Sequence, residues 1–248
     1  SQAYSYSFKG WTPEISAVTS DAVYKAVFDS TLNKYTVTFV DENGSVLQAA
    51  QAYDYGTLAG SIALPKAPEK PSSAEASYTF AGWIPEISDV TADVIYKATY
   101  SSTTNSYTIV FVNEGETLQS SDIAYGIIPV YAGVTPTKAS SVQYMYNFKG
   151  WSPEISAVTS DAVYTAVFDS TLVRYYVQFL NGENVLQADT LEYGILPSYN
   201  AAIPTKENSQ AYSYSFKGWT PEISAVTSDA VYKAEFDSVA IPILSSSS

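Results

Sequence analysis

The sequence predicts a mostly β (β-rich α+β) protein, built as a tandem array of small modules that together form an elongated rod. Three observations predict this fold class. First, the pattern Phe-x-Gly-Trp-x-Pro-Glu-Ile recurs along the chain and holds all 4 tryptophans. Second, the tryptophans stand at positions 11, 83, 151 and 219, so the intervals are 72, 68 and 68 residues, a fixed period typical of repeat proteins. Third, aromatic and small polar residues alternate before these copies, as in a strand with one buried face.

The period divides the chain into a half module, three complete modules and a tail. Residues 1–33 are the C-terminal half of a module, residues 34–105, 106–173 and 174–238 are repeat modules 1, 2 and 3, and residues 239–248 are a linker or tail. A unit of this size is near the lower limit for a self-supporting core, because it buries only about 60% of its unfolded surface. The 22 Tyr, 10 Phe and 4 Trp supply the large side chains that such a core needs.

The half module contains two predicted strands joined by a loop. Over residues 4–8, aromatic side chains alternate with serine, which predicts the first strand. Gly10 interrupts the alternation and predicts a β-bulge that turns the next side chain to a new direction. Pro13 cannot donate to a strand ladder, so residues 12–21 are expected to form a loop at the sheet edge. The second strand is expected over residues 22–28.

Each complete module places a hairpin in front of such a half. In module 1, alternation over residues 35–39 predicts a strand, the following Asn-Gly predicts a hairpin turn, and a second strand is expected over residues 46–53. Residues 57–77 contain three prolines and are the least regular part, with room for one or two helical turns near their start. Modules 2 and 3 repeat this order. The six-residue stretches between units are mostly polar and are expected to be short joints: residues 29–34, 101–106 and 169–174.

The order of these motifs resembles the Listeria–Bacteroides repeat, the internalin B-repeat type. The resemblance covers the three full units and the leading half, and in module 1 it rests on Tyr35-Thr36-Val37-Thr38-Phe39, a glycine turn, Tyr55-Gly56, Pro68, Tyr78-Thr79-Phe80-Ala81-Gly82-Trp83 and Tyr96-Lys97-Ala98. The Trp-x-Pro-Glu-Ile segment and the longer middle segment depart from the family pattern. The resemblance implies small β-grasp-like modules, repeated in secreted and cell-wall proteins of bacteria, often as a stalk between a functional head and the wall. It carries over no catalytic residue.

Composition excludes several classes of function. The formal net charge of -13, from 25 acidic and 12 basic residues, repels phosphate backbones, so nucleic acid is not an expected partner. The same charge disfavours an anionic membrane surface, and no apolar run is long enough for membrane insertion as a helix. Cysteine and histidine are both absent, which excludes thiol nucleophiles, histidine triads and ordinary zinc sites. We therefore predict no catalytic residue, no cofactor and no metal.

The repeated tryptophans are the candidate ligand-binding residues, because aromatic faces stack well on sugar rings. The alternative is that each tryptophan fills the core of its own small module, and the high average burial of Trp in folded proteins favours this alternative. The candidates are Trp11, Trp83, Trp151 and Trp219.

Two carboxylates also recur, seven residues apart in each unit: Glu14, Glu86, Glu154 and Glu222, with Asp21, Asp93, Asp161 and Asp229. Paired carboxylates that flank a cleft can hydrolyse glycosides, but an enzyme seldom needs successive copies of one site. The favoured interpretation is a turn, in which the aspartate accepts hydrogen bonds from backbone N–H groups.

The half module has an inner face but no first hairpin to cover it. Tyr6, Phe8, Tyr24 and Phe28 are expected on this face, and a two-stranded sheet is marginal in water. Either upstream residues of the native protein complete the module, which is the preferred explanation, or a neighbouring chain adds the missing strands. The second explanation makes these residues an assembly surface and predicts head-to-tail filaments, because a heterologous contact that does not close propagates.

Together these features predict a non-enzymatic repeat segment of a secreted or cell-wall-attached bacterial protein, acting as a stalk or spacer and in adhesion. The expected partners are other domains of the same surface protein. The alternatives are an extracellular filament subunit that binds itself head-to-tail, and a multivalent module whose weak sites for a glycan or a host protein add together.

Overall fold

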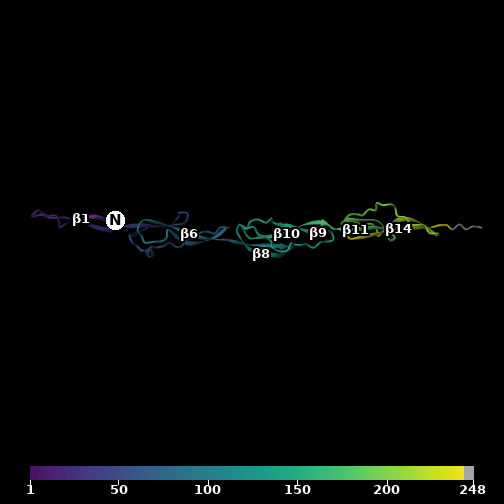
Figure 1. The fold of residues 1–248 in the computed structure, drawn as a ribbon, viewed down its shortest axis with the longest axis horizontal. Coiled ribbons are helices and arrows are strands. Elements are labelled where there is room, and N and C mark those ends of the chain that lie inside the picture. Colours follow the sequence, from purple (N-terminus) through teal and green to yellow (C-terminus); the bar gives the residue numbers. More distant parts are fainter. Residues whose placement is uncertain (243–248) are drawn as a thin grey trace, which may run out of the picture. The chain divides into compact units, whose positions relative to one another are not determined.

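The computed structural model describes residues 1–242 (Figure 1). Within that range the regular structure is strand throughout, apart from one 3-10 turn, η1 (Ala59–Ser61). The strands are β1 (Tyr4–Thr12), β2 (Lys25–Leu32), β3 (Lys34–Val40), β4 (Val46–Asp54), β5 (Ala76–Ile84), β6 (Val94–Thr104), β7 (Ser106–Asn113), β8 (Glu116–Ala124), β9 (Tyr144–Ser152), β10 (Ala162–Leu172), β11 (Arg174–Asn181), β12 (Asn184–Glu192), β13 (Tyr212–Thr220) and β14 (Ala230–Ala240). Among the described residues, no helix has the length and hydropathy needed to cross a membrane.

Each complete module forms one four-stranded sheet, and the strand order is the same in all three. The orders are β4-β3-β6-β5, β8-β7-β10-β9 and β12-β11-β14-β13, while β1 and β2 form a two-stranded sheet. In every four-stranded sheet the two central strands, which are the first and last strands of the module, run parallel to each other. The predicted fold class, mostly β with small sheets repeated in tandem, is confirmed.

The chain forms two compact units. Among the described residues, the first contains residues 1–108, 122–127 and 157–161, and the second contains residues 109–121, 128–156 and 162–242. The β1-β2 sheet and the sheet of module 1 lie in the first unit, and the sheet of module 3 lies in the second. The division passes through the sheet of module 2.

The core of module 1 lies on one face of its sheet. Val37 and Phe39 of β3 are fully buried, as the period-2 pattern predicts, and Tyr96 of β6 is 1% exposed. The rings of Phe39 and Tyr96 stack with centroids 5.3 Å apart. Burying a side chain of this size contributes about 2–3 kcal/mol, so a few such residues supply most of the apolar stabilisation of a small sheet. Module 3 repeats the cluster with Val177, Phe179, Val226 and Tyr232.

A β-bulge at the repeated glycine sets the direction of the tryptophan. In β5 the register with β6 shifts between Phe80 and Gly82, and Gly82 has φ +135°. Residues three apart in a regular strand point to opposite faces, but the bulge brings Trp83 onto the face of Phe80, where their ring centroids lie 5.2 Å apart. The predicted bulge is confirmed at this position, and the same register shift occurs in the other three copies.

The predicted six-residue joints are wrong, because these segments are strand. β2 continues to Leu32, and only Asn33 separates it from β3; Asn105 and Val173 are the single residues at the next two joints. The segments were expected to be loops because their side chains are polar. Here both faces of the two-stranded ribbon are exposed, so a strand needs no apolar side chains while its backbone pairs with β1, β5 or β9.

The remaining elements agree with the sequence to within a few residues. The first hairpin of module 1 and the short helical turn are both present, as β3, β4 and η1. The second strand of the half module begins at Lys25 rather than at residue 22. β14 extends through Ala240, two residues into the predicted tail, and residues 243–248 of that tail lie outside the described part of the chain.

Replacing Gly82 by alanine should destabilise module 1 by about 1 kcal/mol, because an L-residue resists the φ of +135°. A Cβ at this position meets nothing within 4 Å, so the cost is in the backbone and not in a steric clash. Amide hydrogen exchange at Phe39 and Tyr96 measures it. Gly60→Ala is the matched control, since its Cβ also meets nothing but its φ is not positive. Equal losses of protection in the two variants would contradict the bulge explanation.

Candidate functional site

The predicted ligand-binding tryptophans lie in two different environments. In each complete module the tryptophan is half-buried and packs edge-on against a buried phenylalanine of the first strand, with ring centroids 4.8 Å apart: Trp83 on Phe39, Trp151 on Phe111 and Trp219 on Phe179. Trp11 is 46% exposed, and its ring lies 5.6 Å from that of Phe8. Three of the four rings therefore belong to module cores, and Trp11 has no first-strand phenylalanine to pack against.

The predicted assembly residues form an uncovered aromatic face on the half module. Tyr6 is 59% exposed, and Phe8 and Phe28 are each 55% exposed, although their rings contact each other at 5.9 Å. Tyr24 is half-buried and lies just before β2 begins. In module 1 the corresponding strands, β5 and β6, belong to a four-stranded sheet with β3 and β4, whereas β1 and β2 form a sheet of two strands.

The structure also builds a site that the sequence did not predict, at the single residue that joins one module to the next. The backbone N–H of Asn33 donates to the carbonyl of Ala3 at 2.8 Å, which extends the β1-β2 ladder. Its carbonyl accepts from the N–H of Tyr55, which follows β4 in the next module, at 2.8 Å. Asn105 and Val173 make the same two bonds to their neighbours. The joint residue is therefore held by the backbone of both modules, whatever its side chain.

A tyrosine hydroxyl adds a side-chain hydrogen bond to the two backbone bonds at each of these three joints. The first inward residue of each module donates its hydroxyl hydrogen to a backbone carbonyl of the preceding module: Tyr35 to Gln2 at 2.8 Å, Tyr107 to Ala74 at 2.7 Å and Tyr175 to Val142 at 2.7 Å. The ring of this tyrosine packs in its own module, so the same side chain stabilises one core and contacts the other module.

Asparagine and serine side chains complete the first two joints. The Asn105 amide nitrogen donates to the carbonyls of Ser73 and Ala74 at 2.8 and 3.2 Å, and its oxygen accepts from the Ser77 hydroxyl at 2.7 Å. Asn33 and Ser5 make the matching contacts at the first joint. Each asparagine side chain thus links the joint to the strand that pairs with the end of the preceding module, β1 at the first joint and β5 at the second.

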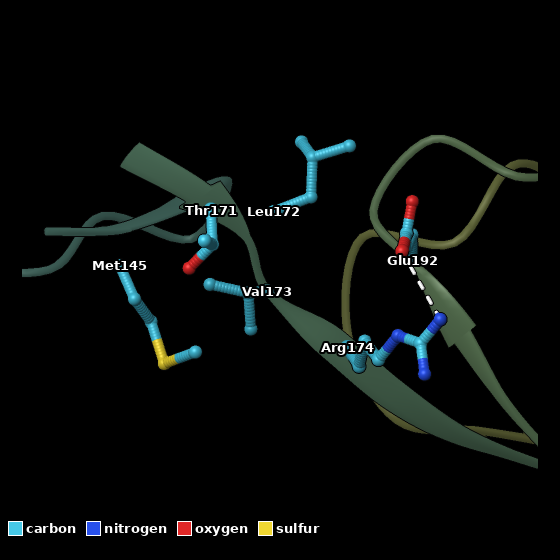
Figure 2. A pocket seen from close by; sticks show the side chains of 6 residues that line it. All are labelled: Met145, Thr171, Leu172, Val173, Arg174 and Glu192. Atoms are coloured by element: carbon cyan, nitrogen blue, oxygen red, sulfur yellow. Dashed lines mark hydrogen bonds and ion pairs between the residues drawn. The ribbon is translucent and has the colours of Figure 1, made fainter. Parts of the chain in front are cut away.

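The third joint replaces this polar pair by an apolar one. Val173 stands where the others have asparagine, and Met145 stands where they have serine. Both side chains line an open hollow of about 520 Å³, and Arg174 and Glu192 line it too. Figure 2 shows these four side chains and the ion pair between Arg174 and Glu192, whose nitrogen and oxygen lie 3.1 Å apart. At these three joints the two positions change together, whereas at the end of module 3 Ile241 makes the same backbone bond with Ser213 at the paired position.

The sequence carried a signal for the joints: asparagine recurs at the joint position in two units, paired with a serine, and both change in the third. The contact between the two positions can be inferred only when it is known that β2, β6 and β10 pair with β1, β5 and β9. Residues 1–242 contain no group of three or more His, Cys, Asp or Glu that could hold a metal ion. The hydrogen bonds at the joints fix the backbone geometry between one module and the next.

The repeated aspartate bonds a backbone N–H, as the turn interpretation expected, but the donor lies in the first strand of the module. Asp93 Oδ1 accepts from Thr36 N at 2.7 Å and from Thr36 Oγ1 at 2.9 Å. These two bonds lower the pKa of Asp93 below its ordinary value. Asp161 and Asp229 bond Thr108 N and Tyr176 N at 2.8 and 2.7 Å. Because each aspartate comes directly before the last strand, it adds a rung to the start of the central parallel ladder.

Module 1 also carries a charged cluster that holds its proline-rich segment to the sheet. Lys70 Nζ lies 2.8 Å from Glu42 Oε1 and 4.2 Å from the centre of the Tyr78 ring. The Tyr100 hydroxyl donates to Asp41 Oδ1 at 2.7 Å, and burial together with this bond raises the pKa of Tyr100 to about 12. The lysine over a tyrosine recurs as Lys138 over Tyr146 and Lys206 over Tyr214.

Comparison with known proteins finds a family match for one part of the chain. Residues 35–106 match the family model of the Listeria-Bacteroides repeat domain, which confirms the resemblance noted in the sequence for this segment. No curated protein matches the chain. A solved structure of streptococcal origin, described as Streptococcal High Identity Repeats in Tandem (SHIRT) domains 3-4 from a cell surface protein, aligns with 54% of this chain and 99% of its own at 14% identity, with a TM-score of 0.27.

Replacing Asn105 by valine should loosen the second joint, because it removes three side-chain hydrogen bonds and leaves the Ser77 hydroxyl without its acceptor. The expected loss is about 1 kcal/mol, seen as faster hydrogen exchange of the Tyr125 amide, which is bonded to Asn105 O. The double variant Asn105→Val with Ser77→Met, which copies the third joint, should recover most of the protection. Asn147→Val, in an exposed position of β9, is the control. A double variant that exchanges faster than Asn105→Val would contradict the pairing.

Replacing Asp93 by asparagine should destabilise module 1 at neutral pH and have little effect in acid. The lowered pKa of Asp93 means that its contribution is present above the ordinary aspartate value near pH 4 and is lost as the pH falls through the lower folded value. Hydrogen exchange of the Thr36 amide at pH 7 and in acid measures this change. Glu69→Gln, which removes only an exposed ion pair with Lys66, is the control. An equal effect of Asp93→Asn at both pH values would contradict this role.

Proposed function

We propose that this chain, whose residues 35–106 match the Listeria-Bacteroides repeat domain, is a non-enzymatic spacer segment of a bacterial surface protein, where it holds other domains away from the cell. One observation carries this proposal. The last strand of each module runs into the first strand of the next with a single residue between them, and that residue bonds the backbone of both modules. A joint of this kind has no free linker, so each added module adds a defined length.

The match of residues 35–106 supports a location at the surface of a bacterium, because the resemblance places the members of this repeat family in secreted and cell-wall proteins. The acidic composition supports it, because a chain of net charge -13 repels anionic membrane and wall surfaces and stays soluble when extended. Adhesion requires a surface that binds a partner, and the recurring tryptophans of the three complete modules are instead half-buried against phenylalanine.

Small-angle scattering tests the spacer. A compact globule of 248 residues has a radius of gyration of about 18 Å, and an array with stiff joints should give a much larger value. A spin-label pair at Ser102→Cys and Ser170→Cys, equivalent exposed positions of β6 and β10 in a chain without native cysteine, should give one narrow distance distribution. A compact particle, or a broad distribution, would overturn the proposal.

Self-assembly is the second candidate function, and the exposed face of the half module favours it. Trp11, Phe8 and Phe28 present apolar rings to solvent, whereas in module 1 the ring of Phe39 covers the same place. The partner that fits this face is a β-hairpin with the alternation of Tyr35, Val37 and Phe39. A second copy of this chain would supply it by releasing such a hairpin from one of its own modules.

Light scattering across a concentration series tests this candidate, with a variant that lacks residues 1–33 as the control. Growth that is lost on deletion, or that a peptide of residues 34–55 suppresses, supports assembly. A monomer at every concentration overturns it.

A multivalent glycan-binding role has less support than the spacer. Stacking on a sugar needs an open aromatic face, and three of the four tryptophans are half-buried against phenylalanine. Trp11 is the ring that remains accessible in the described chain at 46% exposure. Acrylamide quenching of the wild type and of Trp11→Phe separates this residue from the others, and quenching confined to Trp11 excludes repeated sites.

A further inference from the structure

We propose that the central parallel strands make each module a mechanical clamp, which bears tension applied along the chain. The inference deepens the spacer proposal and rests on it, because a segment that separates an attached domain from a surface is pulled at its two ends. It assigns a function to the strand order of the sheet, in which the first and last strands of a module are neighbours.

The direction of load follows from the strand order. The chain enters module 1 at the start of β3 and leaves it at the end of β6, and these strands are parallel neighbours at the centre of the sheet. In a parallel pair, the start of one strand and the end of the other lie at opposite ends of the ladder. Tension therefore slides β3 along β6, and every hydrogen bond of the ladder is loaded at once.

Side chains reinforce the ladder along its whole length. Its register pairs Val37 with Val94 and Phe39 with Tyr96, and the last two stack inside the core at 5.3 Å. At its start, Asp93 bonds both the N–H and the hydroxyl of Thr36. Sliding by one residue would break these bonds and would turn Phe39 toward the other face of the sheet. Modules 2 and 3 have the same parallel pairing and the same aspartate.

The joints transmit tension from one module to the next without a flexible linker. A single residue lies between the last strand of one module and the first strand of the next, so tension passes from one central strand directly to the other. The half module is the natural contrast. β1 and β2 are antiparallel, with Tyr4 paired to Leu32 at one end, so tension at these two ends opens the ladder one bond at a time.

The test pulls the same module in two directions. Handles on Lys34→Cys and Thr104→Cys load β3 against β6 in shear, and handles on Glu75→Cys and Thr104→Cys peel β5 from β6, because Ala76 pairs with Thr104. The full chain is used, and its lack of native cysteine keeps the attachment specific. Single-molecule force spectroscopy then compares two variants of nearly equal stability that differ in the direction of load.

We expect a several-fold higher rupture force in the Lys34–Thr104 direction, followed by a gain in length of about 200 Å as the module extends. In the Glu75–Thr104 direction the first rupture should come at low force and release a shorter segment, about 100 Å at most. Equal forces in the two directions would overturn the clamp.

Asp93→Asn provides the residue-level test, and Asp89→Asn is its matched control. Asp89 also accepts a backbone N–H, from Ala59 at 2.8 Å, but that bond lies outside the central ladder. Asp93→Asn should lower the rupture force in the Lys34–Thr104 direction and leave the Glu75–Thr104 direction unchanged, and Asp89→Asn should change neither. A loss of force in both directions would show that Asp93 acts through general stability, which overturns its place in the clamp.

The two proposals fail separately. Weak modules that still scatter as an extended particle overturn the clamp and leave the spacer intact. A compact particle overturns the spacer, whatever the rupture forces of its modules.

Discussion

The structure depends on one pairing, in which the first and last strands of a module lie parallel at the centre of its sheet. Parallel neighbours cannot be joined by a tight turn, so the chain between β3 and β6 must travel back along the module. It does so through the β4 strand, the proline-rich segment and β5. The same pairing places Phe39 against Tyr96 and Thr36 against Asp93, which are the contacts that stabilise the core and the ladder. It also sends the chain out at the far end of the module, where the next module begins.

The aromatic pattern follows from the small size of the sheet. A unit of this length has few interior positions, and large rings fill them with the least chain. The bulge at Gly82 adds one more ring to the interior, since it returns Trp83 to the face that Phe80 occupies. The Trp ring then closes the core over Phe39. Residues 1–33 lack both the first hairpin and the segment that follows it, and Phe8, Trp11 and Phe28 remain exposed there, so contacts from the rest of a module, and not the local sequence, bury these positions.

The joints share the same backbone and tyrosine hydrogen bonds but differ in their other side chains. Backbone bonds and a tyrosine hydroxyl fix every joint, and neither depends on the joint side chain. The side chains then adjust each joint, with the polar pair of Asn105 and Ser77 in one place and the apolar pair of Val173 and Met145 in another. Repeats joined in this way can be added without a linker, because the end of each sheet already has the groups that the next sheet needs.

The period, most of the strand pattern and the bulge at the repeated glycine could be predicted from the sequence, because these follow from local spacing and composition. Tyr35, Val37 and Phe39 show their buried face by alternation alone. The sequence misread the joints, since Ser- and Thr-rich segments predict loops where pairing with β1 or β5 makes them strands. The sequence did not predict that β3 lies parallel to β6, that Asp93 accepts hydrogen bonds from Thr36, or that Asn33 bonds two modules. Each of these joins residues far apart in the chain, and no local pattern specifies which distant backbone supplies the partner.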